Sequence, residues 1–113
     1  MTVADVVVSK SGECCIVEPS GHVEVLDDQT LAAVAKALGN PTRLRIVRLL
    51  AARHSCATGE FVAELSLAQS TVSEHLRILR EVGLIQGEIE GPRTSYCVNP
   101  DRLASWKQAV ASL

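Results

Sequence analysis

The sequence predicts a mainly α-helical fold with one small β-hairpin. Three observations support this prediction: apolar residues recur at helical spacing in five segments after residue 26, most of these segments begin at a residue that favours helix starts, and two alternating runs near the C-terminus flank a Gly-Pro pair. The chain has 113 residues, of which 47% are hydrophobic and 21% charged. This size and composition predict a single folded domain with no room for a separate catalytic one.

Composition excludes several classes of protein. Aromatic residues make up only 3% of the chain, which disfavours a base-stacking single-strand binder or an aromatic-lined cofactor pocket. Residues 1–40 hold two basic and six acidic residues, whereas residues 41–113 hold nine basic and seven acidic ones. No apolar run approaches the roughly 20 residues of a membrane span. We therefore expect a cytoplasmic protein without a membrane partner, whose second part is mildly basic.

Residues 1–26 are predicted to form an N-terminal arm, because they show no lasting helical period and contain Gly12, Pro19 and Gly21. Short β-type runs at 6–8 and 22–26 are compatible with a little extended structure. Residues 27–113 are predicted to form the folded domain.

Two helices open this domain. Asp27 or Asp28 is expected to cap the first helix, and Gly39 to end it. Its apolar positions are Leu31, Val34, Ala35 and Leu38. Asn40 is a good cap for a second helix that begins at Pro41 and reaches about Ala52. This helix carries several arginines, and we expect it to bury Leu44, Val47 and Leu50.

A helix, a tight turn and another helix follow. Thr58 is predicted to cap a short helix to about Leu65 that buries Phe61, Val62 and Leu65, and the stretch 66–69 leads into a helix over 70–82. In the latter, Val72, Leu76 and Leu79 fall on one helical face and are predicted to be core residues. The opposite face is short, polar and capable of hydrogen bonding.

The C-terminal third is predicted to be a hairpin and a last helix. The runs 84–89 and 93–98 alternate around a tip with Gly91 and Pro92. Asn99 caps the final helix, with Pro100 at its first position. Leu103, Trp106, Val110 and Leu113 form an apolar seam along it. This seam can be buried by a second copy of the chain or by the chain itself.

A helix-turn-helix followed by a two-stranded wing suits duplex DNA, since the major groove admits one α-helix and a wing can reach the backbone or the minor groove. The candidate DNA-binding residues are Gln69, Ser70, Thr71, Ser73, His75 and Arg77 on the helix and Arg93 at the wing tip. The alternatives are a polar face that only meets water and a protein-interaction module.

The segments ALGNPTRLRIVRLL (37–50) and STVSEHLRILREVGLI (70–85) strongly resemble the ArsR/SmtB family of metal- and arsenic-sensing repressors, from about Leu31 to Val98. The resemblance implies a homodimeric winged-helix repressor that binds a palindromic operator and whose S-x-x-S-x-H-L helix enters the major groove. It also implies a dimer interface made by the first and last helices. In this chain the interface residues would be Leu31, Val34, Leu103, Trp106 and Val110.

Two metal sites common in the family are absent from the sequence. Phe61-Val62-Ala63 stands where one family site has Cys-Val-Cys, and the last helix lacks the histidine of the other. Cys14 and Cys15 in the arm and Cys56 before the helix-turn-helix resemble a branch with vicinal N-terminal cysteines and a third cysteine near this point. Adjacent cysteines do not close a relaxed disulfide. Three thiolates suit a thiophilic ion, so we expect arsenite, trivalent arsenic, as the inducer.

Other roles for these cysteines stay open at this point. The ion can be antimonite, cadmium, lead or zinc, with zinc requiring a fourth ligand from Cys97, His54 or His22. A thiol-redox repressor is a further alternative. A thiol-dependent reductase is disfavoured, because the sequence has no C-x-x-C motif and no phosphate-cradling loop. Cys97, in the second hairpin strand, is expected to be buried as packing filler.

Overall fold

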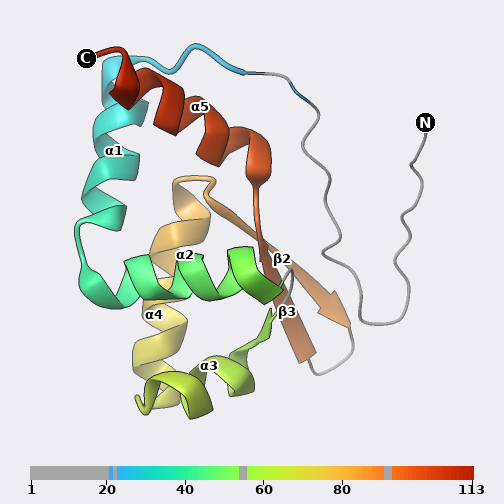
Figure 1. Ribbon diagram of the computed structural model, residues 1–113. Coiled ribbons are helices and arrows are strands. Elements are labelled where there is room, and N and C mark those ends of the chain that lie inside the picture. The colour runs from blue at the N-terminus through green and yellow to red at the C-terminus, as the bar shows by residue number, and fades with distance from the viewer. Residues whose placement is uncertain (1–20, 22, 54–55, 91–92) are drawn as a thin grey trace.

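A computed structural model describes residues 21, 23–53, 56–90 and 93–113, with only the backbone for residues 56–57, 88–90 and 93–94. The elements are α1 (Asp28–Leu38), α2 (Pro41–Arg53), β1 (Cys56–Ala57), α3 (Thr58–Leu65), α4 (Gln69–Glu81), β2 (Ile85–Glu90), β3 (Arg93–Val98) and α5 (Pro100–Ala111). Figure 1 shows α1 and α5 together on one side of the molecule and α3 on the opposite side. The predicted mainly helical fold with a β-hairpin is confirmed.

Side-chain caps set the starts of three helices, as the sequence predicts. Asp27 Oδ1 accepts a hydrogen bond from the Thr30 backbone N–H at 2.8 Å at the start of α1. Asn40 Oδ1 accepts from two N–H groups in the first turn of α2. Asn99 Oδ1 accepts from the Arg102 N–H at 3.2 Å at the start of α5. Each cap satisfies a backbone donor that has no partner within its own helix.

The core lies where α1, α2, α3 and α4 meet the start of β2. Its fully buried members include Val34, Ile46, Leu50, Phe61, Val72, Leu76, Leu79, Leu84 and Ile85. The prediction for Leu44 is wrong: this side chain is 36% exposed, and Ile46 occupies the buried position instead. The reason is the rotation of α2, which turns Ile46, Val47 and Leu50 inward as one stripe.

Within the part of the chain that the structure describes, the sheet has three strands in the order β1-β3-β2, and both pairs are antiparallel. The hairpin of β2 and β3 confirms the predicted wing, although its first strand begins at Ile85 instead of Leu84. The two-residue strand β1 was not predicted, because a run of two residues carries no periodicity. It pairs Cys56 with Tyr96 and Ala57 with Ser95, so the chain between α2 and α3 is joined to the wing.

Helix α4 ends one residue before the predicted Val82, in a left-handed glycine turn. The Leu84 N–H donates to Leu79 O at 3.1 Å and the Gly83 N–H donates to Arg80 O at 3.0 Å. Gly83 has φ +81°, a conformation that glycine adopts without strain. Nη1 of Arg102 donates to Val82 O at 3.0 Å, which ties α5 to this turn.

The chain segment before α1 runs along α5 (Figure 1). The Glu24 backbone N–H donates to Oγ of Ser105 at 2.8 Å, and Ser105 is only 1% exposed. Contacts with the folded body therefore begin before residue 27, where the sequence places the domain boundary. The described part of this segment contains no strand. Within the described residues, no helix is both long and apolar enough to span a bilayer.

Candidate nucleic-acid interface

Helix α4 separates its residues into a buried face and an exposed face. Val72, Leu76 and Leu79 are at most 1% exposed, as the sequence predicts. The predicted DNA-contacting side chains on the other side are exposed: Gln69, Ser70, Thr71, Ser73 and Arg77. Because α4 starts at Gln69 instead of the predicted Ser70, the first three of them lie in its first turn. Burial of the apolar face thus presents a row of hydrogen-bonding groups on the surface.

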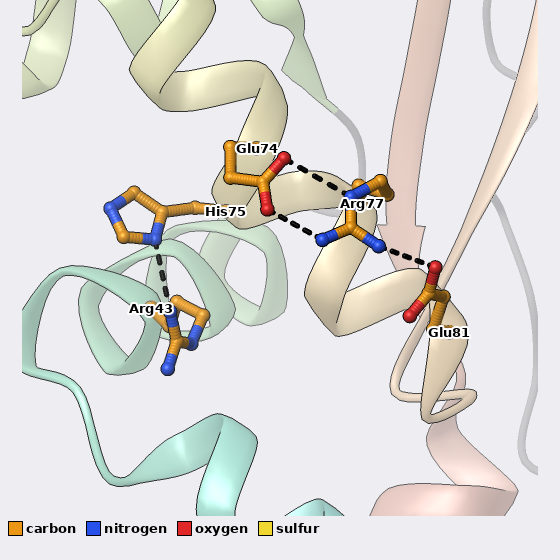
Figure 2. A network of polar contacts seen from close by, with 5 residues as sticks. All are labelled: Arg43, Glu74, His75, Arg77 and Glu81. Carbon is orange, nitrogen blue, oxygen red and sulfur yellow. Dashed lines mark hydrogen bonds and ion pairs between the residues drawn. The ribbon is translucent and has the colours of Figure 1, made fainter.

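His75 lies at the edge of this exposed face and is half-buried. Its Nδ1 lies 3.2 Å from Nη1 of Arg43, in the first turn of α2 (Figure 2). Burial lowers the pKa of His75 below its ordinary value, the charge of Arg43 lowers it further, and Glu74 acts in the opposite direction. Burial and Arg43 thus both favour the neutral form of the His75 ring.

Arg77 is held by two carboxylates of its own helix. Its Nε donates to Oε1 of Glu74 at 3.1 Å, its Nη2 donates to the same carboxylate, and its Nη1 donates to Glu81 (Figure 2). The hydrogen bond with Arg77 lowers the pKa of Glu74 and raises that of Arg77. The sequence prediction missed this arrangement, although spacings of three and four residues between opposite charges are the signal for it.

The wing follows α4 directly. Strand β2 pairs with β3 from Ile85 opposite Val98 to Glu90 opposite Arg93. The backbone of Arg93 thus begins the second wing strand next to the tip, as predicted, and its side chain lies outside the described residues. A recognition helix and a hairpin on consecutive stretches of chain are the two parts that a winged DNA-binding domain needs.

Comparisons with known proteins agree with this geometry. The family model described as bacterial regulatory protein, arsR family, matches residues 40–86, which run from the cap of α2 into β2. An HTH-type transcriptional regulator of Methanocaldococcus jannaschii is 39% identical over 72 residues, which cover 64% of this chain and 81% of that protein. The chain belongs to the ArsR family.

Two further similar proteins extend the match. The arsenic resistance transcriptional regulator ArsR1 of Pseudomonas putida is 32% identical over 93 residues, covering 81% of this chain and 70% of that protein. A solved structure of a possible transcriptional regulator for arsenical resistance is 29% identical, with a TM-score of 0.64, covering 71% of this chain and 81% of the other. This ArsR-family chain is therefore a transcriptional regulator with a winged-helix fold, and the relatives named above are transcriptional regulators as well.

The cysteines of this ArsR-family chain are only partly placed. Cys14 and Cys15 lie outside the described residues, and for Cys56 the backbone alone is described, in β1. Cys97 is 3% exposed, as expected for packing filler. Among the described residues, no three His, Cys, Asp or Glu side chains gather as a metal site would require. The structure thus brings Cys56 to the junction between α2, α3 and the wing.

The residues expected at a dimer interface differ in how far the chain itself buries them. Leu31, Leu103 and Trp106 are half-buried, and Val110 is 37% exposed. The indole Nε1 of Trp106 donates to Leu31 O at 3.3 Å, which joins α5 to α1 within one chain. The placement of Val34 at an interface is corrected, because its side chain is completely buried in the chain's own core. Leu113 lies beyond the end of α5 and is 94% exposed.

Proposed function

We propose that this ArsR-family regulator is a homodimeric repressor that binds palindromic operator DNA and is released when arsenite binds Cys14, Cys15 and Cys56. The observation that carries the DNA-binding part is the exposed polar face of α4, held outward by the burial of Val72 and Leu79. Side chains of this kind form hydrogen bonds with base edges and phosphates.

The first turn of α4 supports the same proposal. Ala68 occupies the N-cap position, and within the described residues no side chain caps this helix. No side chain in that part of the chain therefore caps the backbone N–H groups at the start of α4, and the side chains of Gln69, Ser70 and Thr71 in the same turn are exposed. A helix start of this type attracts a phosphate group, because its donors and its dipole both favour negative charge.

Dimerisation is proposed through α1 and α5. A groove of about 420 Å³ lies between residues 23–26, α1 and α5. Val25, which lines this groove, is 100% exposed, and Val110 of α5 is 37% exposed, so both segments present an apolar side chain at the surface. A two-fold dimer would present two α4 helices to successive major grooves, which matches a palindromic operator.

The inducer part of the proposal rests on the three cysteines of the sequence and on the arsenic resistance named for the Pseudomonas putida relative. Thiolates select soft ions, and each thiol that binds arsenite replaces one hydroxide, which leaves as water with the thiol proton. Residue 56 pairs with Tyr96 of β3 and is followed within two residues by α3. An ion held at Cys56 would therefore act on the backbone that connects α2, α3 and the wing.

Release requires that arsenite binds the DNA-free form of the dimer more tightly than the DNA-bound form. A coupling of about 3 kcal/mol, which corresponds to roughly a hundredfold change in affinity, is enough for regulation. Arsenite is As(OH)3 at neutral pH, so each As–S bond that forms replaces an As–O bond, and the thiol proton leaves with the hydroxide as water. The proposal therefore predicts that arsenite affinity changes little with pH while the thiols are protonated, whereas a divalent cation on the same thiols would release protons and bind more tightly as the pH rises.

The test is a fluorescence-anisotropy titration of the full chain on the duplex that it enriches from a random-sequence pool. We expect arsenite to release the DNA, and single Cys14→Ser, Cys15→Ser and Cys56→Ser variants to bind DNA normally but resist release. Cys97→Ala is the matched control and should still respond. Release by cadmium, lead, zinc or peroxide but not by arsenite would overturn the choice of inducer and leave the DNA-binding role intact.

The dimer is tested separately by sedimentation equilibrium. Val110→Glu places a charge on the exposed apolar surface of α5 and should shift the protein toward monomer with weaker DNA binding. Lys107→Glu changes an exposed side chain on the same helix and is the control. A wild-type protein that is monomeric when bound to DNA would contradict this part of the proposal.

A further inference from the structure

Arg43 is fixed at the meeting point of α1 and α2. Its backbone N–H donates to Oδ1 of Asn40 at 3.1 Å, so its main chain is part of the α2 cap. Its Nε donates to Ala37 O at 2.6 Å, in the last turn of α1, and Ala37 is 3% exposed. A cation near the carbonyl end of a helix is favourable, so this bond orients the guanidinium plane.

The same guanidinium reaches α4 through a second nitrogen. Nη1 of Arg43 lies 3.2 Å from Nδ1 of His75. A guanidinium has only N–H donors, so Nδ1 must be the acceptor in this contact. The neutral ring then carries its proton on Nε2, the nitrogen that points away from Arg43 in Figure 2.

We propose that Arg43 is a positioning residue for operator recognition: it holds His75 in the Nε2–H form, so that α4 offers DNA a neutral hydrogen-bond donor at this position. The partner would be an acceptor atom of the duplex, either a phosphate oxygen or an acceptor on a base edge. The inference deepens the proposed function and depends on its DNA-binding part.

The charges around His75 agree with this assignment. A doubly protonated ring would direct its Nδ1–H at the Arg43 donor, which is repulsive in a half-buried position. Glu74 is the neighbouring acid on α4, but its carboxylate is engaged by Arg77. Burial and Arg43 both lower the pKa of His75, which independently favours the neutral ring.

The first test needs no DNA and so separates this inference from the proposed function. Long-range ¹H–¹⁵N correlation spectra of the full chain should show the Nε2–H form of His75 at neutral pH. Arg43→Met should shift the ring toward a mixture of both neutral forms, and Arg43→Lys, which keeps the charge without the planar fork, should do so in part. Arg45→Met removes a cation from an exposed position on the same helix and should leave the His75 signals unchanged.

The second test asks whether DNA binding uses the Nε2–H donor. Gln can place an amide N–H near the position of Nε2, whereas Asn reaches only the position of Nδ1. On the selected duplex, His75→Asn should weaken binding about tenfold, and His75→Gln should retain most of the affinity. Arg43→Met should weaken binding in the wild type but add little in the His75→Gln background, because the two residues act as a unit.

Modified duplexes identify the acceptor. A methylphosphonate at one position should abolish the difference between wild type and His75→Asn if the partner is a phosphate, and a base analogue that lacks the contacted major-groove acceptor, such as 7-deazaguanine or 7-deazaadenine, should do so if it is a base. An unchanged His75 ring in Arg43→Met, or additive effects of the two substitutions on DNA binding, would overturn the proposal. So would a difference between wild type and His75→Asn that no modified position removes.

Discussion

Nε of Arg102 lies 3.3 Å from Oε1 of Glu24, forming an ion pair between α5 and the segment that precedes α1. The same guanidinium donates from Nη1 to Val82 O, at the C-terminal end of α4. One side chain therefore connects the C-terminal end of the predicted arm, at Glu24, with the end of the proposed recognition helix. Nε of Arg102 is buried and forms an ion pair with the Glu24 carboxylate, but the geometry of this contact does not meet the criteria for a hydrogen bond.

Replacing Arg102 by Met should destabilise the protein by about 1–2 kcal/mol, because the Val82 carbonyl loses a charged donor. The side chain of Arg102 is 25% exposed and that of Glu24 45%, so the ion pair itself adds little to this value. Urea denaturation measures the change. Lys107→Met removes an exposed cation from the same helix, and an equal effect there would show that the Val82 contact is not the cause.

Gly83→Ala should cost about 1–2 kcal/mol, because a residue with a Cβ is strained at φ +81°. The added Cβ would also lie 3.1 Å from Nη1 of Arg102, so that side chain must shift. Gly59→Ala is the matched substitution, since Gly59 lies within α3 and a Cβ there meets no atom within 4 Å. It should stabilise the protein by about 0.5 kcal/mol. Thermal unfolding of the two variants should show shifts of opposite sign.

Glu74→Gln should raise the affinity for non-specific duplex DNA about fivefold, because it frees part of the Arg77 guanidinium and removes a negative charge from the surface of α4. The affinity should also fall more steeply with salt. Titrations at several salt concentrations measure both quantities. Glu64→Gln removes a carboxylate from an ion pair with Arg53 that does not involve α4, and it should change neither.

Acid should destabilise the wild type partly through His75. The folded-state pKa of His75 lies below its ordinary value of 6.5, so above that pH both the folded and the unfolded ring are neutral. As the pH falls, the unfolded ring takes up its proton first, and stability is lost down to the folded-state pKa. Unfolding free energies between about pH 7.5 and about pH 5.5 should therefore fall less in His75→Gln. Equal slopes would place the acid sensitivity elsewhere.

The helices could be predicted from the sequence because their signals are local. Asp27, Asn40 and Asn99 are caps within a few residues of the groups they bind, and the stripe of Val72, Leu76 and Leu79 repeats at helical spacing. The exposure of Leu44 depends on how α2 is rotated against its neighbours, and strand β1 depends on a partner about 40 residues away. Neither kind of information is contained in a short window.

The sequence predicted which residues form the candidate DNA-binding surface, but not the contacts that these residues make with one another and with α2. Its exposed polar side chains follow from the amphipathic pattern of α4. The contact between His75 and Arg43 could not be predicted, because it joins two helices through tertiary packing. The pairing of Arg77 with Glu74 and Glu81 was within reach of the sequence, since all three lie on one helix.

Strand β1 occupies two residues, yet it ties the stretch between two helices to the hairpin through the pairing of Cys56 with Tyr96. Under the proposed function, the pairing of β1 with β3 connects the inducer-binding Cys56 directly to the wing. A regulator built in this way can come to respond to a different ion when the side chains around β1 change, while the helix that recognises its promoters keeps its sequence. Evolution can then vary the stimulus and the target genes separately.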